Sequence, residues 1–253
     1  MSTHYDSISE DYARSKLAPW RRFVERATLF ELLGTPAGLS VLDLACGSGF
    51  YSRLLRAARA DRVVGVDLSE GMIELARRDE AAEPLGIMYH VADVMELALG
   101  DTFDVVFAAY LFNYAKTADE LAAMCRAVVQ HLKPSGRLVA VLNNPEQSPT
   151  DWETIRKYGY VKSAALPLVE GAAITHTMFP PGGGTFAFDN YYLSPPTHHR
   201  AFHAAGLRDV SWHLPRVSAD GEAAYGPGYW DDFLADPPIL FLTARVRGPH
   251  RVP

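Results

Sequence analysis

The chain has 253 residues and a formal net charge of −6, with 48% hydrophobic and 21% charged residues. This is ordinary globular composition, and a chain of this length can bury a core without disulfides or metals. The acidic balance and the lack of a dense Lys/Arg run argue against a nucleic-acid substrate. The pairs Arg21-Arg22 and Arg77-Arg78 are expected on solvated helix faces. The two cysteines, Cys46 and Cys125, are too few for a disulfide framework.

The residue pattern of the sequence predicts neither a targeting segment nor a metal-binding motif. Residues 1–16 are polar, and no apolar run approaches the ~20 residues that a membrane span needs. We therefore expect a cytoplasmic protein without a membrane partner. The nine histidines form no pair with metal-ligand spacing and a carboxylate partner, so no metal is predicted. The oligomeric state stays open.

The predicted elements begin with helices in an N-terminal extension over residues 1–39, which is broken at Gly34 and Pro36. Strands and helices then alternate from residue 40 onward. The strands are expected at 41–45, 62–66, 87–91, 103–109 and 137–142, and the helices between them at 50–60, 70–78 and 121–132. This alternation predicts a doubly wound α/β fold whose sheet is mostly parallel, with right-handed crossovers.

The alternation stops over residues 143–194. Two β-like runs, 174–179 and 185–192, flank a Pro/Gly-rich turn and predict a β-hairpin inserted after the fifth strand. A helix over 195–205 and strands over 207–214 and 239–246 would complete a seven-stranded, Rossmann-like sheet. We expect an N-terminal helical lid, 1–39, and one domain, 40–253, with a substrate-side insertion over 143–194.

A nucleotide site is predicted where the first two strands end. The run Val41–Ala45 leads into the turn Gly47-Ser48-Gly49 and then a helix, so backbone can approach a ligand closely there. Asp67 ends the second strand, at the sheet edge where an acidic residue accepts hydrogen bonds from ribose hydroxyls. Dinucleotide sites have a third glycine where this chain has Ser52, and no P-loop sequence is present.

A series of segments in this order resembles the motifs of class I S-adenosylmethionine-dependent methyltransferases. The series comprises Val41–Gly49, Asp67, Val91–Val94, Phe103–Ala109 and Leu132–Leu138. The resemblance implies S-adenosyl-L-methionine as cofactor and S-adenosyl-L-homocysteine as product. It implies that Asp67 binds the ribose, that Asp93 binds the adenine, and that Tyr12, in the lid, binds the methionine carboxylate. The cofactor-binding residues it implies are Tyr12, Asp43, Ala45, Gly47, Gly49, Asp67, Leu68, Met72, Ala92, Asp93, Val94 and Ala109.

A second resemblance extends over most of the chain. The start His4–Ile8 and the stretch Phe188–Tyr192 are similar to the toxoflavin-synthase group of azapteridine N-methyltransferases. This resemblance implies N-methylation of a heterocyclic secondary metabolite, as in antibiotic biosynthesis. The expected partner is therefore a small-molecule methyl acceptor.

Substrate positioning is expected from aromatic and amide side chains, because methyl transfer needs alignment above all, worth roughly 7–11 kcal/mol. Tyr110 and Tyr114 follow the fourth strand and Asn143 the fifth, at the ligand edge of the sheet. Phe186 and Phe188 are expected in the core. His176 or Tyr192 could act as a base, although a methylated ring nitrogen can lose its proton to solvent. The positioning candidates are Tyr5, Tyr110, Asn113, Tyr114, Asn143, Asn190 and Tyr192.

Three alternatives stay open at this point. A C- or O-methyltransferase of natural-product biosynthesis would use much the same scaffold. A NAD-dependent oxidoreductase shares the fold but would lack the third glycine. A nonenzymatic nucleotide-binding protein would carry the same motifs.

Overall fold

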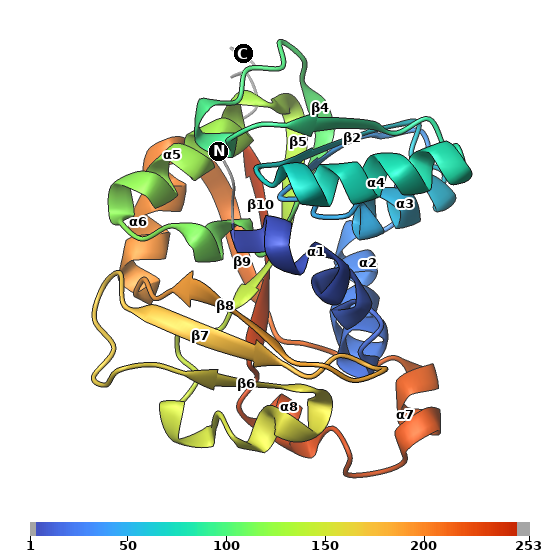
Figure 1. The fold of residues 1–253 in the computed structure, drawn as a ribbon. Helices are drawn as coiled ribbons and strands as arrows, with labels where there is room; N and C mark the ends of the chain where they lie inside the picture. The colour runs from blue at the N-terminus through green and yellow to red at the C-terminus, as the bar shows by residue number, and fades with distance from the viewer. Residues whose placement is uncertain (1–3, 247–253) are drawn as a thin grey trace.

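The computed structural model describes residues 4–246, except for the side chains of residues 4–7 and 151. Its main element is a seven-stranded sheet in the order β3-β2-β1-β4-β5-β10-β9 (Figure 1). The strands are β1 (Ser40–Leu44), β2 (Arg62–Asp67), β3 (Met88–Val91), β4 (Phe103–Ala109), β5 (Leu132–Asn143), β9 (Leu207–His213) and β10 (Ile239–Val246). The first five run parallel, and β10 is antiparallel to both of its neighbours. The predicted doubly wound, mostly parallel sheet is confirmed.

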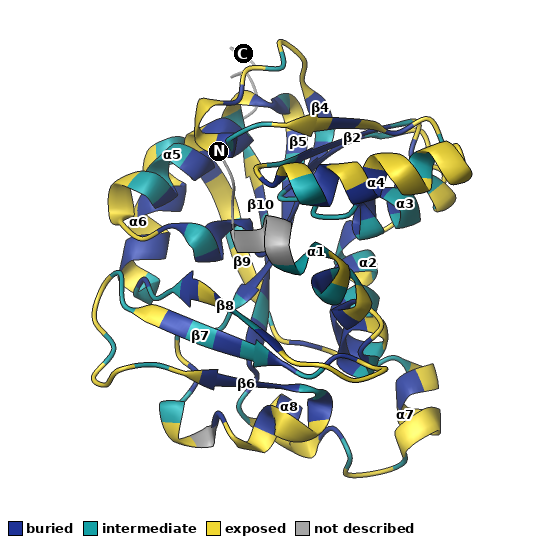
Figure 2. Ribbon diagram, viewed as in Figure 1, coloured by how far each residue is buried: buried dark blue, intermediate teal, exposed yellow. Residues whose placement is uncertain are grey.

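Helices cover both faces of this sheet, which explains why its central strands are apolar throughout. Val41, Val105 and Val139 share one hydrophobic cluster, which includes side chains of α2 (Arg26–Leu33), α3 (Phe50–Ala57) and α4 (Glu70–Ala82). Their neighbours along the strands face a second cluster that includes α5 (Ala118–Gln130) and α6 (Pro195–Ala205). The central strands β4 and β5 are accordingly buried along most of their length (Figure 2). Burial on both faces is typical of parallel strands.

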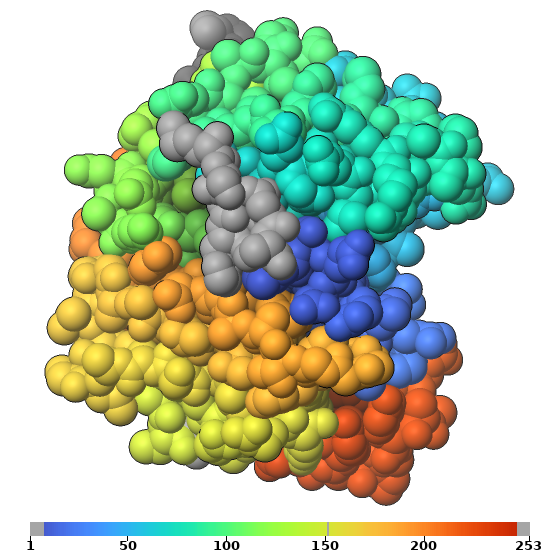
Figure 3. Space-filling view, in the orientation of Figure 1, coloured from blue at the N-terminus to red at the C-terminus, as the bar shows by residue number. Residues whose placement is uncertain are grey.

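The N-terminal segment forms α1 (His4–Ser15), a π-helix (Arg21–Glu25) and α2. Helix α1 packs on α4 of the large sheet and on β8 of the inserted sheet described below. Figure 3 shows it, in dark blue, between the cyan-to-green half of the molecule and the yellow-to-orange half. The first helix therefore joins two parts of the chain that lie far apart in sequence.

The insertion after β5 is a three-stranded antiparallel sheet of β6 (Tyr160–Ser163), β7 (Ala173–Met178) and β8 (Phe186–Tyr191). The predicted hairpin is present as β7 and β8. Strand β6 was not predicted, since its four residues follow two short 3-10 helices, Pro149–Asp151 and Thr154–Tyr158, and give little periodic pattern. Two short helices, α7 (Ala219–Tyr225) and α8 (Asp231–Ala235), precede β10.

Several element boundaries differ from the prediction; α4, for example, continues four residues beyond its expected end, and α5 begins three residues before its expected start. Strand β5 begins at Leu132 rather than at Arg137, because Leu132 pairs with Phe103 across an irregular step before Arg137 pairs with Val105. The expected turn therefore lies inside the strand as a bulge-like irregularity. Helix α3 ends at Ala57, three residues earlier than expected.

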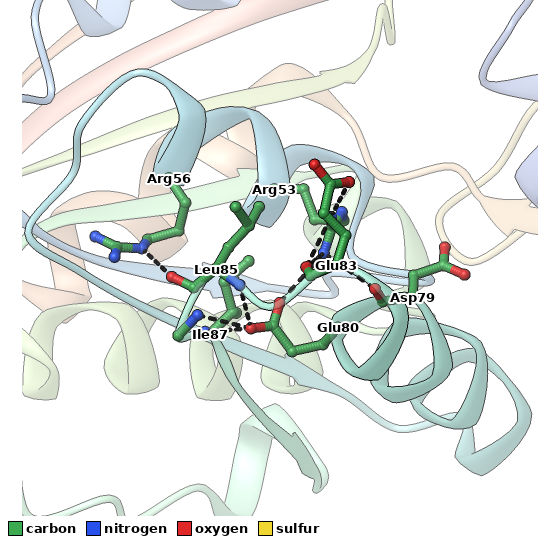
Figure 4. A network of polar contacts seen from close by, with 8 residues as sticks. Arg53, Arg56, Asp79, Glu80, Glu83, Leu85 and Ile87 are labelled. Atoms are coloured by element: carbon green, nitrogen blue, oxygen red, sulfur yellow. Dashed lines mark hydrogen bonds and ion pairs between the residues drawn. The ribbon is translucent and has the colours of Figure 1, made fainter.

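The loop between α4 and β3 is held against α3 by a polar network (Figure 4). One Glu80 carboxylate oxygen accepts hydrogen bonds from the backbone N–H groups of Leu85, Gly86 and Ile87 at 2.7–3.2 Å. Arg53 of α3 donates to Glu80 at 3.2 Å and to the carboxylate of Glu83 at 2.8 Å. These bonds connect α3, the helix that follows the turn at residues 47–49, to the loop that leads into β3.

Candidate active site

The turn after β1 has an unusual backbone. Ala45, Gly47 and Gly49 have φ values of 57°, 56° and 80°, all in the left-handed region. Glycine adopts this region freely, whereas the non-glycine Ala45 is strained there, as residues at ligand sites often are. The alternating positive φ values bring the backbone of this turn to the carboxyl edge of β1.

Tyr89 of β3 explains why positions 49 and 65 must lack side chains. A Cβ on Gly49 would collide with the Tyr89 hydroxyl and lie 2.8 Å from its Cζ. A Cβ on Gly65 would lie 2.7 Å from the same ring. The buried Tyr89 ring thus fills the space beneath the turn. In dinucleotide-binding folds a third glycine allows the helix to pack closely on the strand. Here the packing of Tyr89 against Gly49 and Gly65 takes the place of that contact.

Two acidic residues are fixed at the ends of neighbouring strands. Asp67, the last residue of β2, accepts hydrogen bonds from the backbone N–H of Gly47 at 2.8 Å and of Ser69 at 2.9 Å. Asp93, after β3, caps a 3-10 helix by accepting from the N–H of Met95 at 2.8 Å. Parallel strands end at one edge, so both carboxylates face the same cavity, together with Gly47.

That cavity encloses about 290 Å³ and is mainly apolar. Its walls come from the ends of β1, β2 and β4, from the start of α3 and from α1. The lining residues are Tyr12, Lys16, Asp43, Ala45, Cys46, Gly47, Phe50, Tyr51, Asp67, Leu68, Ser69, Met72, Asp93, Val94, Met95, Ala109, Leu111, Tyr114 and Met124. A mostly apolar hollow with a few polar groups is typical of a cofactor site.

The charges of this cavity favour a ligand that carries positive charge. Three carboxyl groups line it, on Asp43, Asp67 and Asp93, against one cation, Lys16. Burial raises the pKa of Asp43 to about 7, although a hydrogen bond from the Ser52 hydroxyl at 2.6 Å opposes this rise. A dinucleotide pyrophosphate would face this acidic set at close range, which disfavours it.

Lys16 is the cation of the cavity, and its side chain is 9% exposed. Its Nζ lies over the rings of Tyr12, Tyr51 and Tyr110 at 5.1–5.7 Å from their centroids. Among the described side chains, Nζ has no hydrogen-bond acceptor. A cation over ring faces is stabilised, yet its donors stay available to an anionic group of a ligand.

A second buried group of charges lies beside Lys16. Arg21 and Glu25 form an ion pair at 2.9 Å in which the side chains are 3% and 0% exposed. The Glu25 carboxylate also accepts hydrogen bonds from the hydroxyls of Tyr51 and Tyr110. Arg21 was expected on a solvated face, and this expectation is wrong because its guanidinium pairs with a carboxylate inside the core; Arg22 is exposed, as expected.

A smaller cavity adjoins the first one and shares Tyr12 and Tyr114 with it. It lies between the large sheet, the N-terminal segment and the inserted sheet. The lining residues are Tyr12, Trp20, Arg21, Tyr110, Tyr114, Asn143, Tyr160, His176, Met178, Phe188, Asn190 and Ile239. Its walls are therefore aromatic rings together with amide, imidazole and guanidinium groups.

Asn143 holds the polar side chains of this second cavity together by hydrogen bonds. Its Nδ2 lies 3.2 Å from Nε2 of His176 and donates to Oδ1 of Asn190 at 3.0 Å. Burial, together with the charges of Lys162 and Arg21, holds the pKa of His176 well below its usual value. The imidazole is therefore neutral and stacks on Phe188 with centroids 5.3 Å apart.

Comparison with known proteins agrees with this geometry. Residues 41–136 match a family model described as a methyltransferase domain. The N-demethylindolmycin N-methyltransferase of Streptomyces griseus is 29% identical, over 84% of this chain and 90% of its own. The dTDP-3-amino-3,4,6-trideoxy-alpha-D-glucopyranose N,N-dimethyltransferase of Streptomyces venezuelae is 31% identical, over 69% and 77%. The chain belongs to the class I S-adenosylmethionine-dependent methyltransferases.

The solved structure of the CcbJ methyltransferase from Streptomyces caelestis has the same fold as this methyltransferase. The two superpose with a TM-score of 0.67 and 21% identity, covering 97% of this chain and 98% of the other. The cofactor is S-adenosylmethionine, and the larger cavity suits it. Its acidic set complements a sulfonium and an ammonium group, and its one lysine complements a carboxylate.

Most of the predicted cofactor residues of this methyltransferase meet in the larger cavity. Those that line it are Tyr12, Asp43, Ala45, Gly47, Asp67, Leu68, Met72, Asp93, Val94 and Ala109. Gly49 lies behind the turn, against Tyr89. The backbone N–H of Ala92 donates to the carbonyl of Asp67 at 3.0 Å and continues the ladder from β3 to β2. These two residues support the walls of the cavity without lining it.

The predicted positioning residues of the methyltransferase are more scattered. Tyr110, Tyr114, Asn143 and Asn190 line the second cavity. Asn113 is buried behind it, and its Oδ1 accepts from the N–H of Asn143 at 3.2 Å. Tyr192, half-buried, lines neither cavity. The side chain of Tyr5 lies outside the described residues. Phe186 and Phe188 belong to the core, and Phe188 also lines the second cavity.

Lys16, Arg21 and Glu25 of this methyltransferase were not predicted as site residues. The one available signal was spacing, because Lys16 follows Tyr12 by four residues, which puts both on one side of a helix. Within residues 4–246 no group of three or more His, Cys, Asp or Glu side chains could hold a metal ion. No helix in that part of the chain is long and apolar enough to cross a bilayer.

Proposed function

We propose that this enzyme transfers the methyl group of S-adenosylmethionine to a ring nitrogen of a planar heterocyclic metabolite. The observation that carries the proposal is the second cavity, which adjoins the cofactor cavity through Tyr12 and Tyr114. It combines aromatic faces with the amides of Asn143 and Asn190. Flat rings stack on aromatic faces such as those of Tyr12 and Tyr114, where the two cavities meet, and the amides supply donors and acceptors for groups on the edge of a heterocycle.

The relatives and the sequence support the same choice of acceptor atom. Both relatives described above are N-methyltransferases by name. The segments His4–Ile8 and Phe188–Tyr192 resemble those of azapteridine N-methyltransferases. The net charge of −6 argues against a nucleic-acid substrate. The names of the relatives favour nitrogen as the acceptor atom, and the resemblance to azapteridine N-methyltransferases favours a small heterocycle over an amino sugar such as the one in the second relative's name.

We assign the cofactor contacts residue by residue. Asp67 accepts hydrogen bonds from the ribose hydroxyls, and Asp93 with Val94 holds the adenine. Lys16 and Tyr12 bind the methionine carboxylate. S-adenosylmethionine supplies an activated methyl group, so the protein has mainly to align the acceptor with it.

The N-terminal segment, residues 1–39, serves in this proposal as a lid. It contributes Tyr12 and Lys16 to the cofactor cavity and Trp20 and Arg21 to the acceptor cavity. A segment that lines both cavities can exclude water from them and fix both ligands together. Residues 40–253 then form the catalytic domain, with the insertion over 143–194 as the acceptor wall.

Proton removal from the methylated nitrogen needs no dedicated base in this proposal. The depressed pKa of His176, caused by burial and by nearby Lys162 and Arg21, makes its imidazole a poor proton acceptor. Burial raises the pKa of Tyr192, which keeps this phenol neutral as well. The proton therefore leaves to solvent, and His176 acts by hydrogen bonding.

A two-stage experiment tests the proposal. A thermal-shift titration with S-adenosylhomocysteine, with NADH as control, should show saturable stabilisation by the sulfur nucleotide alone. Acceptors of the azapteridine class are then incubated with enzyme and S-adenosylmethionine and analysed by mass spectrometry and NMR. A methyl group on a ring nitrogen is the expected product. A methyl group on carbon or oxygen, or turnover of none of the heterocycles, would refute the proposed acceptor.

A further inference from the structure

Three buried hydrogen-bond donors in the acceptor cavity have no partner among the described residues. They are Nε1 of Trp20, Nε of Arg21 and the hydroxyl of Tyr160. Each of these side chains lines the cavity, and each is at most 3% exposed. Buried donors are nearly always satisfied in proteins, so three unpartnered donors on side chains that line one cavity indicate that this cavity takes up a hydrogen-bond acceptor group.

The size of the cavity limits what that atom can belong to. Its volume is about 20 Å³, whereas one water molecule needs roughly 10–15 Å³ of the same measure. A whole ring does not fit into this space, but a single oxygen substituent does. The rest of the acceptor would then extend toward Tyr12 and Tyr114, which the cavity shares with the cofactor site.

The charge balance decides between a neutral and an anionic oxygen. Arg21 is already paired with Glu25 at 2.9 Å, and both side chains are buried, so this pair has no net charge. Lys16 is the other cation of this buried group, and in the proposed function the methionine carboxylate matches its charge. A carboxylate bound to Arg21 would therefore leave two anions beside one guanidinium in the core, which is costly. An uncharged carbonyl oxygen can accept two or more hydrogen bonds and disturbs no charge balance.

We propose that the acceptor carries a carbonyl group and that Trp20, Arg21 and Tyr160 bind its oxygen, selecting lactam-type heterocycles. This inference rests on the proposed function, because it takes the second cavity as the acceptor site. The same donors disfavour an ammonium group there, since a cation offers no lone pair. The subsite therefore determines which substrates are accepted, while the cofactor cavity is left unchanged.

The test uses full-length enzyme saturated with S-adenosylhomocysteine and measures binding by calorimetry. Quinazoline-2,4-dione is the probe, and quinazoline, which has the same rings without carbonyl groups, is its matched comparison. We expect the dione to bind to the wild type at least about 10-fold more tightly, as for a ligand that satisfies buried donors. Tyr160→Phe removes one donor and should weaken dione binding about 5- to 30-fold, with quinazoline binding unchanged.

Tyr225→Phe makes the same chemical change outside both cavities and should alter neither affinity. Equal binding of the two probes, no saturable binding of the dione, or an unchanged dione affinity in Tyr160→Phe would overturn the inference. Tighter binding of quinazoline-2-carboxylate than of the dione would overturn the assignment of an uncharged oxygen. None of these measurements involves turnover, so they stay separate from the test of which atom is methylated.

Discussion

Asp67 and Gly47, twenty residues apart in sequence, are joined by a hydrogen bond of 2.8 Å from the glycine N–H to the aspartate Oδ2. The bond ties the end of β2 to the turn after β1. It therefore fixes the glycine turn and orients a carboxylate at the cofactor cavity. A change at Asp67 should consequently affect both the proposed ribose contact and the shape of the turn.

Asp67→Ala should weaken binding of S-adenosylhomocysteine by roughly 1–3 kcal/mol, the scale of a lost buried hydrogen bond. Isothermal titration calorimetry measures the change. Asp61→Ala, which alters an exposed aspartate directly before the first residue of β2, at the opposite end of the strand from Asp67, is the matched control and should leave the Kd unchanged. An Asp67 variant with wild-type affinity would contradict the ribose assignment.

Lys16→Met removes a charge but keeps the length of the side chain. We expect it to weaken S-adenosylhomocysteine binding by about 1.5–3 kcal/mol, the scale of a charge-assisted hydrogen bond. Binding of 5′-methylthioadenosine, which lacks the amino acid half, should not change. This pair of ligands separates loss of the carboxylate contact from general damage to the site. Equal losses for both ligands would mean that Lys16 acts only through packing on Tyr12, Tyr51 and Tyr110.

Glu25→Gln breaks the buried ion pair with Arg21 and should lower the free energy of unfolding by roughly 3–5 kcal/mol, because an uncompensated guanidinium stays in the core. Urea denaturation measures this loss. Glu31→Gln removes the partner of Arg216 in an exposed ion pair and should cost less than about 1 kcal/mol. Similar effects of the two variants would show that the buried pair contributes no more than the exposed one.

The ionisation of Glu25 also predicts a pH dependence. Burial alone would raise the pKa of this carboxyl, but the charges of Arg21 and Lys16 and the hydrogen bonds from Tyr110 and Tyr51 lower it below its ordinary value of 4.5. A lowered pKa in the folded state stabilises the fold above pH 4.5, and this contribution is lost as the pH falls toward the folded pKa. The Gln variant should therefore show a weaker loss of stability in acid than the wild type.

The raised pKa of Asp43 predicts that the free energy of unfolding changes with pH in the opposite direction, over a higher pH range. Burial raises its pKa from 3.8 to about 7, so between these values the folded protein holds a proton that the unfolded chain has released. The free energy of unfolding should thus fall as the pH rises from about 4 to 7 and be level above that. Between pH 5 and pH 8, wild type should lose about 2–3 kcal/mol more than Asp43→Asn. Parallel pH profiles from urea denaturation would contradict this prediction.

Much of the fold was predictable from the sequence because its signals are local. Apolar runs such as Val63–Val66 that alternate with helical patterns determine a parallel sheet, and the glycines of 47–49 mark the turn at its edge. The short strand β6 was not predictable, since four residues without a clear pattern become a strand only by pairing with β7. The same holds for the irregular start of β5, which depends on Phe103 of β4.

The sequence by itself determined the doubly wound sheet and the edge at which its motifs gather, and the resemblance of those motifs indicated the class of enzyme and the cofactor. These follow from motifs whose spacing fixes their positions in one topology. The tertiary structure alone decided that Lys16, Arg21 and Glu25 are buried. Arg21 and Glu25 are only four residues apart, but their pair lies in the core because the hydroxyls of Tyr51 and Tyr110, from distant segments, donate to the Glu25 carboxylate there. The tertiary structure also decided that Trp20 and Tyr160, 140 residues apart, bring unpartnered donors to one cavity.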